Sequence, residues 1–308
     1  MFSLDGRTAI VTGGAVGVGR SLAAGLAGAG AVVTICDIRP DVAQTAEQLS
    51  AGGARVTGIV ADVSRPEDVR RVVDAAAART GGVDVLVNNA GVVAVTTPTD
   101  DWEKSLADYD HVLGTNLKGA FLFGRAVAPL MVERGGGEIV NVSTDHVHTC
   151  GWPDPVDHAD APTCPWRGER RTTGWVYLDL YDASKWALNG LTQSWAKMLR
   201  PHGIRVNNLC IGATDSAMNR GFFGYAYEPG TEPPADLLAW WMDPDRVAEV
   251  MLELLAEGPE GRSGDNVGLW LGHPTVLPPP SPVLDVRPDF DAAALPNLGQ
   301  PPTGARPA

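Results

Sequence analysis

Short apolar runs rich in β-branched residues alternate along the chain with longer segments in which apolar residues recur with a helical period. The short runs predict strands of a buried parallel sheet, and the longer segments predict the helices that connect them. We expect strands near residues 8–12, 31–36, 55–60, 83–88, 138–143, 204–210 and 266–271. We expect helices near residues 17–29, 40–51, 66–80, 101–113, 116–134, 181–200 and 244–256. This alternation predicts an α/β fold of the Rossmann type, with a doubly wound parallel sheet.

Length, composition and charge narrow the class of protein. The chain has 308 residues, of which 44% are hydrophobic and 20% charged, so it can form one large α/β domain. No apolar run approaches the roughly 20 residues that cross a bilayer, and residues 1–6 lack the regions of a signal peptide. A formal net charge of −13 opposes binding to nucleic acid. We therefore expect a cytoplasmic protein that binds neither membranes nor nucleic acid.

A glycine-rich segment follows the first predicted strand and opens the first predicted helix. Glycines at positions 13, 17 and 19 let the backbone turn tightly and let the helix N-terminus approach a pyrophosphate, whose charge it favours. The second strand ends at Asp37, where a carboxylate can bind both ribose hydroxyls of NAD and repel the extra phosphate of NADP. Arg39 is the nearby residue that could weaken this preference. The alternative is a glycine-rich turn followed by a solvated Asp.

Tyr181 and Lys185 stand four residues apart in a predicted helix, so they share one face about a turn apart. The Lys185 ammonium is expected to favour the phenolate of Tyr181 and to lower its pKa from about 10 toward neutrality. A Tyr of this kind can accept or donate a proton while a hydride moves. The same pair also occurs as an ordinary exposed Tyr near a Lys, and the dinucleotide-binding segment favours the chemical interpretation.

From Leu4 to Leu271 the chain resembles the short-chain dehydrogenase/reductase family. Its motifs occur in the family's order: residues 12–19 (Thr-Gly-x-x-x-Gly-x-Gly), Asp62-Val63, residues 88–91 (Asn-Asn-Ala-Gly), Asn116, Tyr181 with Lys185, and residues 205–207 (Arg-Val-Asn). The resemblance implies an NAD-dependent oxidoreductase that oxidises a secondary alcohol reversibly. It implies the catalytic residues Tyr181, Lys185, Thr144 and Asn116, with Asn116 anchoring a proton-relay water. It implies that NAD contacts Gly13, Val16, Gly17, Val18, Gly19, Asp37, Ile38, Asp62, Val63, Asn89, Ala90, Gly91, Tyr181, Lys185, Gly212, Thr214 and Ser216.

Two positions depart from the family pattern. The catalytic hydroxyl usually belongs to the second of two small hydroxyl residues after the fifth strand, which here is Thr144. The alternative is that Thr144 packs or caps and that Ser143 is the donor. Ile211-Gly212 replaces the Pro-Gly after the sixth strand, which should loosen that loop slightly without removing its hydrogen bonds. Ser216 stands where a Thr normally meets the nicotinamide carboxamide.

The segment between Thr144 and Tyr181 is far longer than in the family. We interpret residues 146–178 as an insertion within a single domain of residues 1–272, ordered beside the active site as a roof or a partner contact. Its His and Cys residues raise a zinc alternative, but their spacing matches no common zinc module, so we expect no metal: they are His146, His148, Cys150, His158 and Cys164. Residues 273–308 are expected to form a Pro-rich C-terminal extension without strands or helices.

Aromatic residues follow Ser216 in the segment that closes over the substrate in the family: Phe222, Phe223, Tyr225, Tyr227, Trp240 and Trp241. Such walls favour a cyclic, aromatic or terpenoid alcohol. A sugar or polyol dehydrogenase, an epimerase or dehydratase, and a non-catalytic NAD-binding regulatory protein are the alternatives. Family members commonly pair through the helices that here begin near Asp101 and Tyr181, so we expect a homotetramer or homodimer.

Overall fold

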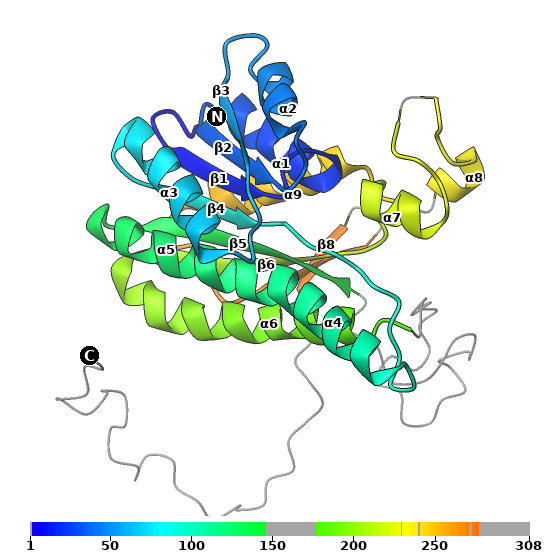
Figure 1. Cartoon of the computed structure of the whole chain (residues 1–308). Helices are drawn as coiled ribbons and strands as arrows, with labels where there is room; N and C mark the ends of the chain where they lie inside the picture. The colour runs from blue at the N-terminus through cyan, green and yellow to red at the C-terminus, as the bar shows by residue number, and fades with distance from the viewer. Residues whose placement is uncertain (1, 146–176, 229, 240, 271–272, 277–308) are drawn as a thin grey trace, which may run out of the picture. The chain divides into compact units, whose positions relative to one another are not determined.

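The computed structural model describes residues 2–145, 177–228, 230–239, 241–270 and 273–276. Within these ranges the chain forms an eight-stranded sheet in the order β3-β2-β1-β4-β5-β6-β7-β8 (Figure 1). Neighbouring strands pair in parallel, except that β7 and β8 are antiparallel. The strands are β1 (Thr8–Thr12), β2 (Val32–Asp37), β3 (Arg55–Val60), β4 (Val85–Asn88), β5 (Gly137–Thr144), β6 (Ile204–Ile211), β7 (Asn266–Trp270) and β8 (His273–Val276).

Helices connect the strands in the alternation that the sequence predicts. The longer ones are α1 (Gly17–Gly28), α2 (Val42–Leu49), α3 (Pro66–Thr80), α4 (Trp102–Leu113), α5 (Ala120–Glu133), α6 (Asp179–Leu199) and α9 (Pro244–Ala256). Shorter elements are the π-helical η1 (Gly114–Gly119), the 3-10 turn η4 (Arg200–His202), α7 (Ala217–Phe222) and α8 (Ala235–Leu238). The predicted Rossmann-type α/β fold is confirmed.

Apolar cores cover both faces of the sheet. On one face α1, α2 and α9 pack on the strands, with Leu22 and Met251 fully buried. On the other face α3, α5 and α6 pack on the strands, with Phe123 and Trp195 buried between them (Figure 1). A Cβ at Gly124 would lie 2.1 Å from the Trp195 ring, so this close packing requires glycine. Burial of both faces explains why the strands read as continuous apolar runs.

The strand order reverses between β1 and β4. From β1 the chain moves outward to β2 and β3, and it then returns to the centre and builds β4 to β7 on the other side. The loops after β1 and β4 therefore leave the carboxyl ends of adjacent strands in opposite directions and form a crevice, where ligands bind in doubly wound folds. The glycine-rich segment and the Asn-Asn-Ala-Gly motif are these two loops.

Two predictions of local structure were wrong. The segment expected to be one helix from residue 116 is π-helical up to Gly119, because a widened turn cannot be seen in an apolar period of 3.6 residues. Residues 273–276 were expected to lack regular structure, but they pair with β7 as an edge strand, a position that tolerates Pro274. Residues 146–176 and 277–308, most of the predicted insertion and extension, lie outside the described residues.

Candidate active site

The glycine-rich segment forms a tight turn between β1 and α1. Gly13 and Gly17 have φ angles of 65° and 55°, in the left-handed region that favours glycine. A Cβ at Gly19 would lie 2.0 Å from the Gly13 carbonyl oxygen, so no larger residue fits there. Val16 is the N-cap of α1, no side chain caps this end, and the first turn has no acidic residue. The backbone N–H groups in the first turn of α1 therefore fit the pyrophosphate of a dinucleotide.

Asn89, in the loop after β4, holds this turn in shape. Its Nδ2 donates to the carbonyl oxygens of Thr12, at 2.9 Å, and Gly13, at 3.0 Å. The Thr12 hydroxyl accepts from the backbone N–H groups of Asn89 and Ala90, both at 3.0 Å. A Cβ at Gly13 would lie 2.8 Å from the Ala90 Cα, so the two loops are in direct contact. The shape of the turn is thus fixed from the neighbouring strand.

Asp37 ends β2, and two backbone N–H groups hold its carboxylate. Ala15 donates to Oδ2 and Arg39 donates to Oδ1, both at 3.1 Å. The Arg39 guanidinium is paired instead with Asp41, at 3.0 Å from Nε to Oδ1 and 2.7 Å from Nη2 to Oδ2. Hydrogen bonding within this pair raises the pKa of Arg39 and lowers the pKa of Asp41. Both side chains are close to half exposed, so the pair is weak.

Tyr181 and Lys185 lie in the first turns of α6. The Lys185 ammonium is 5.8 Å from the centroid of the Tyr181 ring, and it donates to the Val142 carbonyl oxygen at 2.8 Å. Lys185 is only 4% exposed, and burial lowers its pKa to about 8. Burial therefore makes the charged form of Lys185 less favourable than that of an exposed lysine.

The pKa of Tyr181 is displaced opposite to the sequence-based expectation. Burial raises it most, the carboxylates of Asp182 and Asp145 raise it further, and a hydrogen bond with Thr144 lowers it. The expected net lowering of this pKa is not found: the Lys185 ammonium donates to a backbone carbonyl oxygen, and the effect of burial and the two carboxylates is larger than any effect of its charge. The protein's own groups thus favour the neutral phenol near pH 7.

Ser143 and Thr144, at the end of β5, use their hydroxyls differently. The Ser143 hydroxyl donates to the backbone carbonyl oxygen of Lys185 at 3.1 Å. Thr144 hydrogen-bonds with the side chain of Tyr181, and its Oγ1 lies 3.4 Å from Oδ1 of Asp145. Each hydroxyl thus already has a partner for its single hydrogen, but the Thr144 bond is longer and goes to a side chain that lines the cavity, where a substrate oxygen can replace it. This difference favours Thr144 as the donor to a substrate.

Asn116 lies in η1 and joins the loop after β4 to α6. Its Oδ1 accepts from the Val92 N–H at 2.8 Å, and its Nδ2 donates to the Val92 carbonyl and to the Ser184 hydroxyl, both at 2.9 Å. The Ser184 hydroxyl donates in turn to the Tyr181 carbonyl oxygen at 2.7 Å. Asn116 is 1% exposed and is not among the described residues that line the cavity below. Its side chain is a structural connection next to Tyr181.

The loop after β6 is held by backbone hydrogen bonds although it lacks the family's proline. The Gly212 N–H donates to the Leu269 carbonyl at 3.1 Å, and the Met242 N–H donates to the Ala213 carbonyl at 2.8 Å. Ser216 caps α7 by accepting from a backbone N–H of that helix at 3.2 Å. The Ser216 hydroxyl can still donate its hydrogen, which a hydrogen bond to the carboxamide oxygen of a nicotinamide requires.

All these loops line one cavity of about 900 Å³. Every residue predicted to contact the cofactor lines it, and so does Thr144. Sequence reasoning missed several polar wall residues: Asp110, His111, Thr115, Asp145 and Asn219. Those on α4 and η1 were missed because a helical period reports only the buried stripe. Asp145 could have been found from its place directly after Thr144.

The wall that follows β6 is largely apolar. It is formed by Met218, Phe222, Phe223, Leu237 and Trp241. The rings of Phe223 and Trp241 have centroids 5.4 Å apart. Tyr225 and Tyr227 are not among the described lining residues, and the Tyr227 ring lies 4.8 Å from the Arg220 guanidinium. Trp240 lies outside the described residues.

The residues of the zinc alternative, within 146–164, also lie outside the described residues. Where side chains are described, no group of three or more His, Cys, Asp or Glu could hold a metal ion. In the same ranges no helix is long and apolar enough to cross a bilayer.

Comparison with known proteins identifies the family. The family model described as short chain dehydrogenase matches residues 7–150, and the model described as enoyl-(acyl carrier protein) reductase matches residues 170–269. The stretch between these matches falls within the predicted insertion. A 3-alpha-(or 20-beta)-hydroxysteroid dehydrogenase of Mycobacterium tuberculosis is 34% identical over 215 residues, which cover 70% of this chain and 72% of that protein.

Solved structures agree with this match. A short-chain type dehydrogenase/reductase from Mycobacterium marinum has a TM-score of 0.71 at 26% identity, covering 88% of this chain and 96% of that one. A structure from Beutenbergia cavernae, assigned as an NAD(P)-dependent gluconate 5-dehydrogenase with bound NADP, has a TM-score of 0.63 at 29% identity, covering 82% and 90%. The chain therefore belongs to the short-chain dehydrogenase/reductase family of nicotinamide-dependent oxidoreductases.

Proposed function

We propose that the protein oxidises a secondary alcohol reversibly to a ketone, with NAD as cofactor. One observation carries this proposal: Tyr181, Lys185 and Thr144 line the same cavity as the glycine-rich turn. An acid–base group, a cation and a hydroxyl donor are thus near the site that fits a dinucleotide. These are the groups that removal of a proton and a hydride from one carbinol requires.

A bound nicotinamide ring supplies the hydride acceptor. In our proposal the Tyr181 phenolate takes the proton of the substrate hydroxyl as general base. Thr144 donates a hydrogen bond to the substrate oxygen and so fixes the carbon from which the hydride leaves. Lys185 keeps a positive charge beside the phenol and binds the nicotinamide ribose. The water that Asn116 anchors, which passes the proton outward, would bind the Asn116 backbone carbonyl oxygen, because the side chain is engaged with Val92 and Ser184.

The preference for NAD over NADP rests on the end of β2. The Asp37 carboxylate is fixed there by two backbone N–H groups, so it can accept from the ribose hydroxyls and would repel an additional phosphate. The cation that could receive this phosphate, Arg39, is engaged with Asp41. The Beutenbergia cavernae structure has NADP bound, so membership of the family does not by itself decide between NAD and NADP. We propose NAD for this chain on the strength of its own carboxylate.

For the substrate we propose a cyclic, aromatic or terpenoid alcohol. The wall formed by Met218, Phe222, Phe223, Leu237 and Trp241 presents apolar side chains to the cavity. Burial of a ring against such a wall is favourable, whereas a charged metabolite would lose its hydration there. The relative from Mycobacterium tuberculosis bears the name of a hydroxysteroid dehydrogenase, a class that acts on a fused-ring alcohol.

Asp145 favours a second candidate, a sugar or polyol. Its carboxylate lines the cavity next to Thr144 and acts on the pKa of Tyr181. A carboxylate has about four lone-pair sites, so it can accept from a second substrate hydroxyl in addition to its protein contacts. If the substrate is a polyol, Asp145→Ala should raise the KM for a vicinal diol about tenfold, the cost of a lost charged hydrogen bond. It should leave the KM of a monohydric cyclic alcohol unchanged, although the pH dependence of the rate shifts for both substrates.

A spectrophotometric screen tests the proposed function. Formation of NADH or NADPH is measured with the full chain against steroid, terpenoid and aromatic secondary alcohols, and against polyols and sugar acids. We expect NADH with a cyclic alcohol and little NADPH. Tyr181→Phe is the matched control, because it keeps the ring and removes the acid–base hydroxyl. Product without net NADH would indicate an epimerase or dehydratase. Cofactor binding without any turnover would indicate a regulatory protein.

We also propose that the protein assembles as a homodimer or homotetramer through α4 and α6, which lie side by side (Figure 1). Large apolar side chains on these helices are exposed: Trp102 is 72% exposed, Tyr109 54%, Trp186 47% and Leu106 46%. Apolar groups gathered on two adjacent helices suit a second copy of the same surface, because a two-fold interface is self-complementary.

A further inference from the structure

The catalytic helix begins only two residues before Tyr181. Helix α6 starts at Asp179, its N-cap is Leu178, and no side chain of the N-cap closes this end. The first turn of a helix lacks half of its internal hydrogen bonds and frays unless other groups hold it. The position of the Tyr181 hydroxyl therefore depends on what holds residues 178–181.

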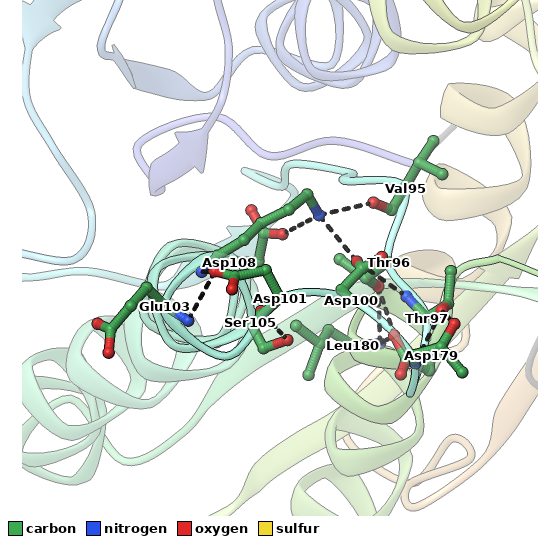
Figure 2. Close-up of polar contacts among 12 residues, drawn as sticks. Val95, Thr96, Thr97, Asp100, Asp101, Glu103, Ser105, Asp108, Asp179 and Leu180 are labelled. Carbon is green, nitrogen blue, oxygen red and sulfur yellow. Dashed lines mark hydrogen bonds and ion pairs between the residues drawn. The ribbon is translucent and has the colours of Figure 1, made fainter.

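Thr96, in the loop between β4 and α4, contacts this helix start directly (Figure 2). It forms an isolated parallel bridge with Leu178, and its N–H donates to the Tyr177 carbonyl oxygen at 2.9 Å. Its hydroxyl donates to the Asp179 carboxylate and lies 3.4 Å from the Leu180 N–H, which also donates to Asp179 at 2.8 Å. Thr96 itself is 3% exposed, whereas Asp179 is exposed, so the bond between them is partly buried.

The loop that carries Thr96 is itself attached to α4. The Lys104 ammonium lies 3.3 Å from the Val95 carbonyl oxygen, 2.9 Å from Asp100 and 2.6 Å from Asp108 (Figure 2). Lys104 is half exposed, and such surface ion pairs contribute little because water and salt screen them. The Lys104 contacts do not reach α6, so the backbone bridge from Thr96 to Leu178 and the bond from its hydroxyl to Asp179 are what join this loop to that helix.

The loop between β4 and α4 is connected to α6 at two points, one on each side of Tyr181. Asn116 joins Val92 to Ser184, three residues after Tyr181, and Thr96 joins the loop to Asp179, two residues before it. A helix end attached at one point can pivot, whereas attachment on both sides of a residue fixes its position. Leu178, which is bridged to Thr96, also lines the cavity.

We propose that Thr96 is a positioning residue that, with Asp179, fixes the first turn of α6 and so sets the distance from the Tyr181 hydroxyl to the substrate. The inference rests on the proposed alcohol oxidation for its kinetic consequence. Misplacement of a catalytic group by about 1 Å can reduce the rate about 10²-fold. Loss of the Thr96 hydroxyl should therefore lower kcat. NAD affinity should be retained, because the glycine-rich turn is held separately by Asn89.

The test compares Thr96→Val, which removes the hydroxyl and keeps the shape, with Thr96→Ser, which keeps the hydroxyl. Thr99→Val is the matched control, because Thr99 is exposed and its hydroxyl pairs only within the loop, with Thr97. We expect Thr96→Val to lower kcat about tenfold or more, within the range for a misplaced group. Thr96→Ser and Thr99→Val should keep wild-type kcat, and NAD Kd should be unchanged in all of them.

A second readout does not require any substrate. Amide hydrogen exchange in residues 180–183 should be faster in Thr96→Val than in Thr96→Ser or Thr99→Val, while the centre of α6 stays protected. Because Thr96 and Asp179 act as a unit, adding Asp179→Asn to Thr96→Val should cost little more than the worse single change. Equal exchange in Thr96→Val and Thr99→Val would overturn the inference, whether or not alcohol oxidation is found. A parallel fall in kcat, NAD affinity and Tm without rescue by Thr96→Ser would likewise overturn it. A wild type without turnover on any alcohol would contradict only the proposed function.

Discussion

The ammonium nitrogen of Lys185 lies 5.8 Å from the centroid of the Tyr181 ring. The two groups share a helix face and a cavity, but the ammonium donates to a strand carbonyl and not to the phenol. Burial and two carboxylates therefore determine the pKa of Tyr181 and raise it. The proposed base must lose its proton before it can accept one from an alcohol, which links the rate to pH.

Alcohol oxidation is expected to become faster as the pH rises. The raised pKa of Tyr181 leaves little phenolate at neutral pH, and the phenolate fraction grows about tenfold per pH unit below that pKa. Reduction of the ketone uses the protonated phenol and should not become faster over the same range. The measurement is kcat/KM against pH in both directions at saturating cofactor. An oxidation rate that falls from pH 7 to pH 9 would contradict this assignment.

The cause of the raised pKa can be tested separately. Asp182→Asn and Asp145→Asn each remove a negative charge that disfavours the phenolate, so each should move the rising limb of oxidation to lower pH. Glu47→Gln, an exposed charge change on α2, is the control and should leave the limb in place. If the rising part of the pH profile lies at the same pH in the wild type and in all three variants, these carboxylates do not affect the pKa of Tyr181.

The hydroxyl donor is expected to be Thr144. Thr144→Val should lower kcat about 10²-fold, as loss of one donor to a developing oxyanion does, whereas Thr144→Ser should stay active. Ser143→Ala should cost less, because that hydroxyl donates to the backbone of Lys185. The measurement is steady-state kcat for the three variants. A larger loss in Ser143→Ala than in Thr144→Val would transfer the role to Ser143.

Cofactor preference is expected to depend on Asp37. Asp37→Ala should narrow the preference for NAD over NADP, since it removes both the ribose acceptor and the charge that repels a phosphate. The Asp41 carboxylate offsets the charge of Arg39 and engages two of its five N–H groups, so adding Asp41→Asn to Asp37→Ala should favour NADP further. Asp41→Asn alone is the control. The check is the ratio of kcat/KM for the two cofactors, and equal use of both by the wild type would refute the account.

Assembly is expected to use the exposed apolar face of α4 and α6. Light scattering should give the mass of a dimer or tetramer, and Trp186→Glu should shift it toward the monomer by placing a charge in the interface. Val60→Glu changes an equally exposed apolar residue on β3 and should not alter the mass. A monomeric wild type would reject the proposal, and so would a Trp186→Glu variant of unchanged mass.

The sequence predicts the parallel sheet well because its strands are buried on both faces. Runs such as Thr8–Thr12 and Val32–Asp37 are apolar almost throughout, so their ends are clear. The tight turn between β1 and α1 is predicted equally well, since its positive φ angles require glycine at Gly13 and Gly17. These features depend on local chemistry, which a sequence displays directly.

Features that depend on distant partners could not be predicted. The Lys185 ammonium donates to Val142, forty-three residues earlier in the chain, and the carboxylate of Asp145, which raises the pKa of Tyr181, lies thirty-six residues before that tyrosine. The buried Thr96 gave no signal, because its partners are the last residue of the predicted insertion, Leu178, and the residue after it, Asp179. Strand β8 was missed because Pro274 indicates a loop unless an edge position is available.

The Tyr181→Phe variant tests the central claim most directly. It keeps the ring that packs at the start of α6 and removes only the hydroxyl that we propose as general base. The measurement is kcat for NADH formation with the best alcohol from the screen, together with NAD Kd by fluorescence titration. The account predicts that kcat falls at least about 10²-fold, as for loss of a general base, while the Kd is unchanged. Residual activity above about a tenth of wild type, well outside the range for such a group, would contradict it.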